Sequence, residues 1–128
     1  MLVLYVEDNE SYAGWVQSVL KQRGYDVITT ANPHSAVTML EQGVVPDIVI
    51  ADFVLNDLTM DGVDVLDAVR ANPKTHAAQT VLTTGFLDML ENRRDVEHVA
   101  NADVILPKTG RAADLIELVE MMAQEQHR

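Results

Sequence analysis

Chemically reactive side chains stand directly after short apolar runs of this sequence. Glu7 and Asp8 follow the first run, Asp52 the third, Thr84 the fourth and Lys108 the fifth. Taken singly, each has a simpler explanation as an acidic loop residue, a helix cap, a strand threonine or a surface lysine. Their repeated position indicates chemistry, because it predicts three carboxylates, one hydroxyl and one ammonium at one edge of a sheet.

Three crowded carboxylates require a compensating cation. Two unit charges about 4 Å apart repel by roughly 1 to 4 kcal/mol at effective dielectrics between water and a protein surface. Mg²⁺ suits such a site best, since it takes a few carboxylates, keeps several waters and binds a phosphoryl oxygen. We predict Asp8, Asp52 and, through water, Glu7 as its ligands. The Asp52 carboxylate can then attack phosphorus and form an aspartyl phosphate, while the Lys108 ammonium stabilises charge on the phosphoryl oxygens.

The residues just described must be positioned by strands and helices, which the sequence predicts as alternating apolar runs and segments of helical periodicity. The apolar runs predict strands over residues 2–6, 25–30, 47–51, 80–84 and 104–106. The periods predict helices over about 11–23, from Asn32 to Gly43, around 65–69, over 87–99 and around 115–122, followed by a frayed polar tail over 124–128. Apolar strands separated by helices imply a parallel sheet covered on both faces. We therefore predict one α/β domain over residues 1–128, a doubly wound five-stranded parallel sheet with five helices.

Composition excludes several classes of function. Twenty acidic residues against nine lysines and arginines give a net charge of -11, which opposes nucleic-acid phosphates, so we expect no direct nucleic-acid binding. The absence of cysteine excludes disulfides and thiolate metal sites. No apolar run approaches the length of a membrane span, and no signal peptide is evident, so we expect a cytoplasmic protein without membrane contact.

Four fragments carry a family resemblance: Val6–Asn9, Pro46–Asp52, Thr84–Gly85 and Ala102–Lys108. Together, and on the expected strands, they resemble the receiver domains of bacterial two-component response regulators, including the chemotaxis-regulator type. The resemblance covers essentially the whole chain. It implies a flavodoxin-like receiver fold and a regulator that assists only its own phosphoryl transfer and autodephosphorylation.

The resemblance also implies roles for individual residues. Asp52 would accept a phosphoryl group from a phosphohistidine on a sensor histidine kinase or a histidine phosphotransfer protein. Thr84 would follow the phosphoryl group, Lys108 would bridge its oxygens, and the backbone carbonyl of Val54 would complete the Mg²⁺ shell. Phosphorylation would shift the conformation of the face formed by the predicted fourth helix, fifth strand and last helix. That face would control an output protein or domain or form a phosphorylation-dependent homodimer.

The loop after the acceptor departs from the family pattern. The segment from Phe53 to Met60 is two residues longer than usual and lacks the usual proline, so we expect a bulged loop beside the site. Asp57 lies within it and is a rival acceptor in principle. It follows no apolar strand, which favours Asp52 over Asp57.

Three further departures concern the switch. Thr109 follows Lys108 where the family has a proline after a cis bond, and we predict a trans bond because a cis bond without proline costs roughly 3 to 4 kcal/mol. Ile105 replaces the family's switch aromatic and can pack inward but cannot swing as a ring does. Phe86, two residues after Thr84, could shield the phosphoryl group from water.

Other assignments stay open. Met89, Leu90 and Met121 are candidate anchors for a partner, with core packing as the simpler explanation. The four histidines show no metal-binding spacing and are expected on the surface. A degenerate receiver that binds partners without phosphorylation is the main alternative. A flavodoxin-like cofactor binder or a small phosphohydrolase is less favoured, because the first strand-to-helix loop lacks a glycine-rich or hydroxyl-rich phosphate cradle.

Overall fold

Five parallel strands form one sheet at the centre of the molecule. The computed structural model describes residues 1–85, 101–108 and 112–126. The strands are β1 (Leu2–Val6), β2 (Asp26–Thr30), β3 (Ile48–Asp52), β4 (Gln79–Thr84) and β5 (Val104–Pro107). They lie in the order β2-β1-β3-β4-β5. The predicted parallel five-stranded sheet is confirmed, and β3 is its central strand.

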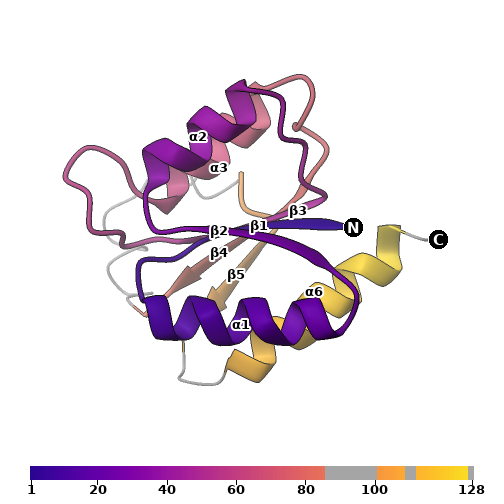
Figure 1. The fold of residues 1–128 in the computed structure, drawn as a ribbon. Coiled ribbons are helices and arrows are strands. Elements are labelled where there is room, and N and C mark those ends of the chain that lie inside the picture. The colour runs from indigo at the N-terminus through magenta and orange to yellow at the C-terminus, as the bar shows by residue number, and fades with distance from the viewer. Residues whose placement is uncertain (86–100, 109–111, 127–128) are drawn as a thin grey trace.

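Helices cover both faces of this sheet. The described helices are α1 (Glu10–Gln22), α2 (Pro33–Glu41), α3 (Gly62–Ala71) and α6 (Ala112–Gln126). In Figure 1, α2 and α3 lie on one side of the sheet and α1 and α6 on the other. The doubly wound fold is therefore confirmed. The helix predicted over 87–99 lies outside the described residues, so four of the five predicted helices are seen in the described part of the chain.

Each strand supplies two hydrophobic layers. Successive side chains of a strand point to opposite faces. Leu4 and Val6 of β1 accordingly pack into the cluster shared with α2 and α3. Val3 and Tyr5 pack into the cluster shared with α1 and α6. Because β1 is buried on both faces, Glu7 lies directly beyond a strand that holds its position firmly.

Local capping explains where the helices begin and end. The Asn9 side chain accepts the backbone N–H of Tyr12 at the start of α1, one residue earlier than predicted. Asn32 caps α2, as its sequence position indicates. Gly24 and Gly43 follow α1 and α2 with φ of 93° and 101°, the left-handed conformation that glycine adopts without strain. The predicted helix stops at these two glycines are confirmed.

Arg70 ties α3 to the sheet. It donates hydrogen bonds at 2.6–3.0 Å to the backbone carbonyls of His76 and Ala78 and to the side chains of Thr80 and Asp103. The Asp103 carboxylate also accepts the backbone N–H of Thr80 at 2.9 Å. One planar guanidinium thus joins the end of α3, the start of β4 and the residue before β5.

The C-terminal segment corrects one prediction. Residues 124–126 continue α6 instead of fraying. The Gln126 amide donates to the backbone carbonyl of Asp47 at 3.1 Å and contacts the Gln79 side chain. The Gln79 amide also donates to Glu125 at 3.3 Å. These polar side chains hold the last turn against the starts of β3 and β4, which hydrophobic periodicity does not reveal.

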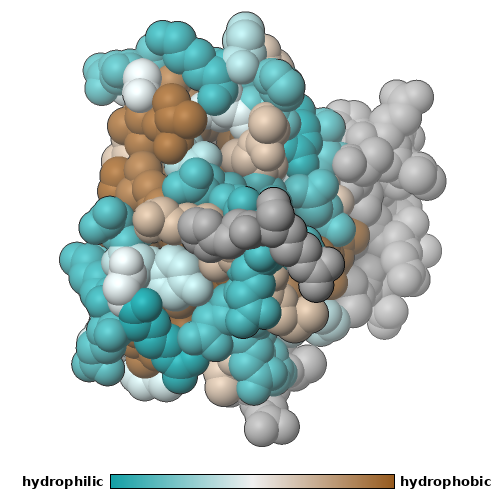
Figure 2. Space-filling view, turned by 90° about the vertical axis from the view of Figure 1, so that its right-hand side faces the viewer, coloured by the Kyte–Doolittle hydropathy of each residue, from teal (hydrophilic) through white to brown (hydrophobic). Residues whose placement is uncertain are grey.

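The end of the molecule where β1 begins and α6 ends is mainly hydrophilic over its described residues (Figure 1 and Figure 2). Figure 2 shows this end with polar residues over most of its surface and a hydrophobic group at the upper left. Val45, just before β3, has 49% of its surface exposed. None of the helices in the described part of the chain has the length and apolar character needed to cross a bilayer.

Candidate functional site

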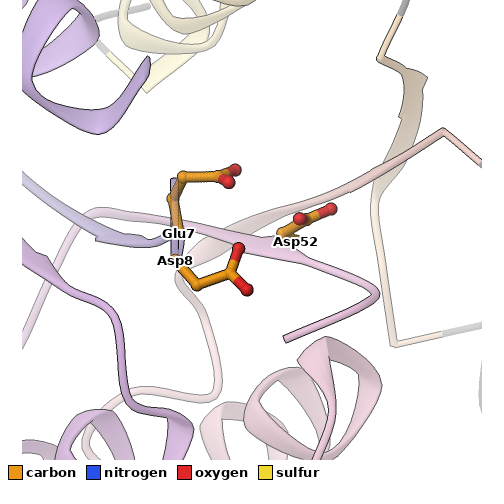
Figure 3. Close-up of side chains that lie close together, drawn as sticks. All are labelled: Glu7, Asp8 and Asp52. Carbon is orange, nitrogen blue, oxygen red and sulfur yellow. The ribbon is translucent and has the colours of Figure 1, made fainter. Parts of the chain in front are cut away.

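Three carboxylates meet at the carboxyl ends of β1 and β3. Val6 pairs with Ala51 in the sheet, so the residues that follow them, Glu7 and Asp52, end neighbouring strands. Figure 3 shows Glu7 and Asp8 extending from the end of β1, with the Asp8 side chain pointing toward Asp52. One ligand oxygen from each carboxylate lies within 4.8 Å of the others. Glu7 is 2% exposed and Asp52 is 6% exposed, so water screens their repulsion poorly.

Lys108 brings a positive charge to the two buried carboxylates. Its Nζ lies 2.9 Å from Glu7 Oε1 and 3.2 Å from Asp52 Oδ2. The same ammonium lies 5.1 Å from the centre of the Tyr12 ring, within the range of a cation–π interaction. Lys108 follows β5 directly, and its backbone N–H donates to the Thr84 carbonyl at 2.7 Å. Four elements therefore meet around one cation: the ends of β1, β3 and β5, and α1.

The pKa values of Asp52 and Lys108 are both raised by their surroundings. Burial, followed by the charge of Glu7, raises the pKa of the Asp52 carboxyl to about 6, although Lys108 opposes the rise. Burial alone would lower the pKa of the Lys108 ammonium, but hydrogen bonding to Glu7 and the charge of Asp52 outweigh it and raise that pKa. Lys108 thus stays protonated, yet a buried negative charge on Asp52 is only partly compensated.

Neighbouring donors hold the other two carboxylates. Glu7 Oε1 accepts the backbone N–H of Asn9 at 3.2 Å, and its Oε2 accepts the Tyr5 hydroxyl at 3.5 Å. Burial, then the charge of Glu7, raises the pKa of Tyr5, so this hydroxyl remains a neutral donor. Asp8 Oδ2 accepts the backbone N–H of Asn56 at 3.1 Å, which links the loop after β3 to the carboxylate cluster.

A glycine allows α3 to begin against the acceptor strand. A Cβ on Gly62 would lie 2.1 Å from the Asp52 carbonyl oxygen, far inside contact distance. The Gly62 N–H donates to the Phe53 carbonyl at 3.1 Å. Asp61 and Asp64 form a reciprocal capping box at the same helix start. The backbone on both sides of Asp52 is thus held by β3 and by α3.

The two threonines at the end of β4 occupy different positions. Thr84, the predicted site residue, is buried, and its carbonyl joins β4 to Lys108. Thr83 was missed: it pairs with Asp52 in the sheet, and its hydroxyl donates to Asp52 Oδ1 at 3.4 Å. Because strand side chains alternate, only one of two adjacent threonines lies beside the Asp52 carboxylate on the same face of the sheet. The strand register decides which one, and the sequence alone does not contain it.

The loop after β3 carries the two other candidate residues, Val54 and Asp57. Val54 is 43% exposed, and the proposed role of its backbone carbonyl stays a prediction. Asp57 Oδ1 accepts the N–H and hydroxyl of Thr59 at 2.8 and 2.7 Å and lies 3.3 Å from His34 Nε2. Hydrogen bonds from Thr59 lower the pKa of the Asp57 carboxyl. Asp57 therefore shapes the loop.

The extended loop forms a pocket of its own. The pocket has a volume of about 260 Å³ and is lined by Asp64 and by most residues of the segment 53–61. The loop residue Leu58 is fully exposed at its surface. None of the three clustered carboxylates lines this pocket, whereas Val54, whose backbone carbonyl is a predicted ligand, does.

The remaining predicted switch residues have mixed outcomes. Ile105 packs, partly buried, against the cluster shared with α2 and α3. Met121 is 60% exposed on α6. The predictions for Phe86, Met89 and Leu90 and for the Lys108–Thr109 bond lie outside the described residues, as does Thr109.

Comparison with known proteins gives a concordant result. The family model described as "Response regulator receiver domain" matches residues 3–120. A comparison with curated protein sequences finds no match.

Solved structures share the fold over nearly the whole chain. The signal receiver domain of a protein described as a Luxo repressor, from Vibrio parahaemolyticus, is 27% identical, with a TM-score of 0.76 over 97% of this chain and 90% of that chain. The response regulator TrrA of Thermotoga maritima, solved with Mg²⁺ and BeF, is 22% identical, with a TM-score of 0.76 over 94% of this chain and 97% of that chain. The receiver domain of a sensor histidine kinase from Pseudomonas aeruginosa, solved with magnesium in its active-site cleft, is 21% identical, with a TM-score of 0.78 over 94% of this chain and 95% of that chain.

Proposed function

Because this chain belongs to the response regulator receiver domain family of two-component signalling, we propose that it is a phosphorylation switch whose phosphoryl acceptor is Asp52. Receiver domains are regulators that pair with histidine kinases and output domains. The observation that carries the proposal is the position of Asp52: a buried carboxylate that lies between two acidic neighbours and the Lys108 ammonium at the end of the central strand.

The charges at the site favour a divalent cation. Three carboxylates face one ammonium, so ionisation of all three leaves two negative charges without a compensating cation in this cluster. We propose that Glu7, Asp8 and Asp52 hold Mg²⁺, with the Val54 carbonyl as a further ligand. Hard oxygen ligands of this kind fit Mg²⁺, which would neutralise charge on a phosphoryl group. The magnesium in the receiver structures from Thermotoga and Pseudomonas supports this assignment.

The acceptor's part in the transfer is nucleophilic attack. An oxygen of Asp52 forms a bond to the phosphorus of a phosphohistidine, and the nitrogen–phosphorus bond breaks. The leaving nitrogen keeps the electron pair of that bond, and the ring departs as neutral imidazole because it takes up one proton from water, before or as the bond breaks. Lys108, already in contact with Asp52, then binds phosphoryl oxygens, and the Thr84 hydroxyl supplies a further donor.

Phosphorylation would act by shifting a population of conformations. It adds about -1.5 to -2 charges at Asp52. A state in which Thr84 and Lys108 both bind the phosphoryl group is then favoured. Because the Lys108 N–H is bonded to the Thr84 carbonyl, such a change would move the ends of β4 and β5 together. We propose that the single domain works in the cytoplasm and that the surface including β5 and α6 contacts the output partner.

Labelling with a small phosphodonor tests the assignment. We expect the purified chain to gain the mass of one phosphoryl group when incubated with acetyl phosphate and Mg²⁺, and to bind Mg²⁺ in a calorimetric titration. Asp52→Asn should abolish labelling, whereas Asp57→Asn should retain it. Labelling of the Asp52→Asn protein would contradict the acceptor assignment. A wild-type chain that neither binds Mg²⁺ nor accepts phosphate would instead indicate a degenerate receiver.

A further inference from the structure

We propose that Thr83 is a positioning residue for phosphoryl transfer: its hydroxyl fixes the orientation of the Asp52 carboxylate before the phosphodonor arrives. This inference rests on the proposed function of Asp52. It assigns a separate role to the residue immediately before the predicted phosphoryl contact, Thr84. The observation that leads to it is the buried hydrogen bond from Thr83 Oγ1 to Asp52 Oδ1.

The sheet places Thr83 beside the acceptor. Asp52 and Thr83 are register partners on the adjacent strands β3 and β4. The backbone N–H of Phe53 donates to the Thr83 carbonyl at 2.8 Å, which anchors the residue directly after the acceptor to the same threonine. Thr83 is also 2% exposed, so little water competes for its hydroxyl. Its branched side chain has restricted rotation about χ1, which helps hold the hydroxyl in place.

The two carboxylate oxygens of Asp52 have different partners. Oδ1 accepts from the Thr83 hydroxyl at 3.4 Å, and Oδ2 lies 3.2 Å from Lys108 Nζ. An ionised carboxylate only accepts hydrogen bonds, so the direction of the Thr83 bond is unambiguous. Rotation of a carboxylate about its terminal torsion is otherwise soft. Donors at both oxygens restrict this rotation and keep the two oxygens distinct.

Orientation matters because in-line attack on phosphorus has strict geometric requirements. Misplacement of a reacting group by about 1 Å can cost a hundredfold in rate. Lys108 is shared with Glu7 and is proposed to move onto the phosphoryl group during transfer. Thr83 has no such second task in the proposed mechanism. It can therefore keep holding the acceptor while Lys108 changes partners.

The adjacent residues Thr83 and Thr84 therefore have different roles in the proposed mechanism. Successive residues of a strand point to opposite faces, so Thr83 and Thr84 cannot both face the Asp52 side chain in the same way. Thr83 orients the carboxylate before transfer. Thr84 is proposed to bind the phosphoryl group that the transfer delivers.

The test compares variants that lose or keep the hydroxyl. Thr83→Val removes it at nearly constant volume, and Thr83→Ser retains it. Thr80→Val is the matched control, because Thr80 is a fully buried threonine of the same strand whose hydroxyl donates to the Asn101 carbonyl and does not contact the acceptor. The rate of Asp52 labelling by acetyl phosphate is measured at saturating Mg²⁺, together with the Mg²⁺ affinity of each protein.

We expect Thr83→Val to slow labelling about tenfold, as loss of a hydrogen bond to a charged group would do. Thr83→Ser should remain within about threefold of wild type, since it restores the donor. Thr80→Val should label at the wild-type rate even if its stability falls. Mg²⁺ affinity should change less than the labelling rate in Thr83→Val. Should Thr83→Val fail to fold, Thr83→Ala is compared with Thr83→Ser in the same assay.

Several results would overturn the inference. Thr83→Val labelled at the wild-type rate, an equal slowing by Thr80→Val, or no recovery in Thr83→Ser would each show that the hydroxyl does not position the acceptor. In those cases wild-type labelling at Asp52 leaves the proposed function intact. Absence of labelling at Asp52 in the wild-type chain would overturn both proposals together.

Discussion

The charge of Asp52 should destabilise the metal-free fold at neutral pH. Burial beside Glu7 raises the pKa of this carboxyl from the ordinary value of 3.8 to about 6. The folded chain therefore binds the proton more tightly than the unfolded chain does. The stabilisation by protonation is fully present below pH 3.8 and is lost as the pH rises to about 6. We therefore expect Asp52→Asn to raise the free energy of unfolding above that pH.

The magnitude follows from the change in proton affinity. Each tenfold change in proton affinity is worth about 1.4 kcal/mol. The rise in the pKa of Asp52 from 3.8 to about 6 therefore corresponds to roughly 3 kcal/mol of folding stability. The side chain is 9% exposed, so solvent screening reduces this figure only moderately. The variant also loses an ionic contact with Lys108, but that ammonium keeps Glu7 at 2.9 Å. A net gain of about 1–3 kcal/mol is expected for Asp52→Asn in the absence of divalent cations.

The assay is urea denaturation followed by circular dichroism, with EDTA present, over a range of pH. The gain in unfolding free energy from Asp52→Asn should be largest above pH 6. It should shrink as the pH falls toward 3.8, below which the wild-type carboxyl is mostly protonated in both the folded and the unfolded chain. Saturating Mg²⁺ should narrow the difference, because a hundredfold excess over Kd would stabilise a binding-competent protein by about 2.7 kcal/mol.

Asp57→Asn provides the matched control for the stability assay. Hydrogen bonds from Thr59 lower the pKa of Asp57, so its charge favours the folded state, and its removal should give no gain in stability. The reasoning is refuted if Asp52→Asn is less stable than wild type at pH 7.5 in EDTA. A gain in stability that does not vary with pH would also refute it.

Four further substitutions are expected to alter the free energy of unfolding measured in urea. Lys108→Met should cost about 1–3 kcal/mol at pH 7.5, because it leaves buried carboxylates without their cation, and the loss should diminish as the pH falls through about 6; an unchanged stability would contradict the ionic account. Gly62→Ala should cost about 2–3 kcal/mol, since its Cβ would overlap the Asp52 carbonyl, whereas Gly14→Ala in α1, with open space, should gain about 0.5–1 kcal/mol. Arg70→Lys should lose about 2–3 kcal/mol because an ammonium cannot reproduce the planar set of four hydrogen bonds, and wild-type stability in this variant would show that charge alone suffices.

The architecture could be predicted because its signals are local and repeated. Runs such as Ile48–Ala51 are apolar throughout, which indicates a strand buried on both faces. Asn32, Gly24 and Gly43 mark helix ends by capping and by left-handed backbone conformations. The final turn of α6 was mispredicted because Gln126 is held by hydrogen bonds to residues far away in sequence. Polar contacts of that kind leave no periodic pattern.

The candidate site could be predicted as far as strand ends determine it. The structure brings Glu7, Asp8 and Asp52 together as expected, and Lys108 contacts two of them. The contact between Thr83 and Asp52 depends on strand register, which packing sets. The hydrogen bond from Asn56 to Asp8 depends on the conformation of a long loop, for which the sequence offers no comparable rule.

The Lys108 ion pairs help to hold the edge strand β5 to the rest of the sheet. In the described part of the chain β5 pairs only with β4, and its residues are only partly buried or exposed. Lys108 reaches past β4 to the carboxylates at the carboxyl ends of β1 and β3, so its ion pairs supplement weak packing at the sheet's edge. A cation that binds those oxygens in place of Lys108, or a phosphoryl group that draws the ammonium away from Glu7, would weaken these ion pairs. The margin of the sheet should therefore loosen first, while its centre keeps its shape.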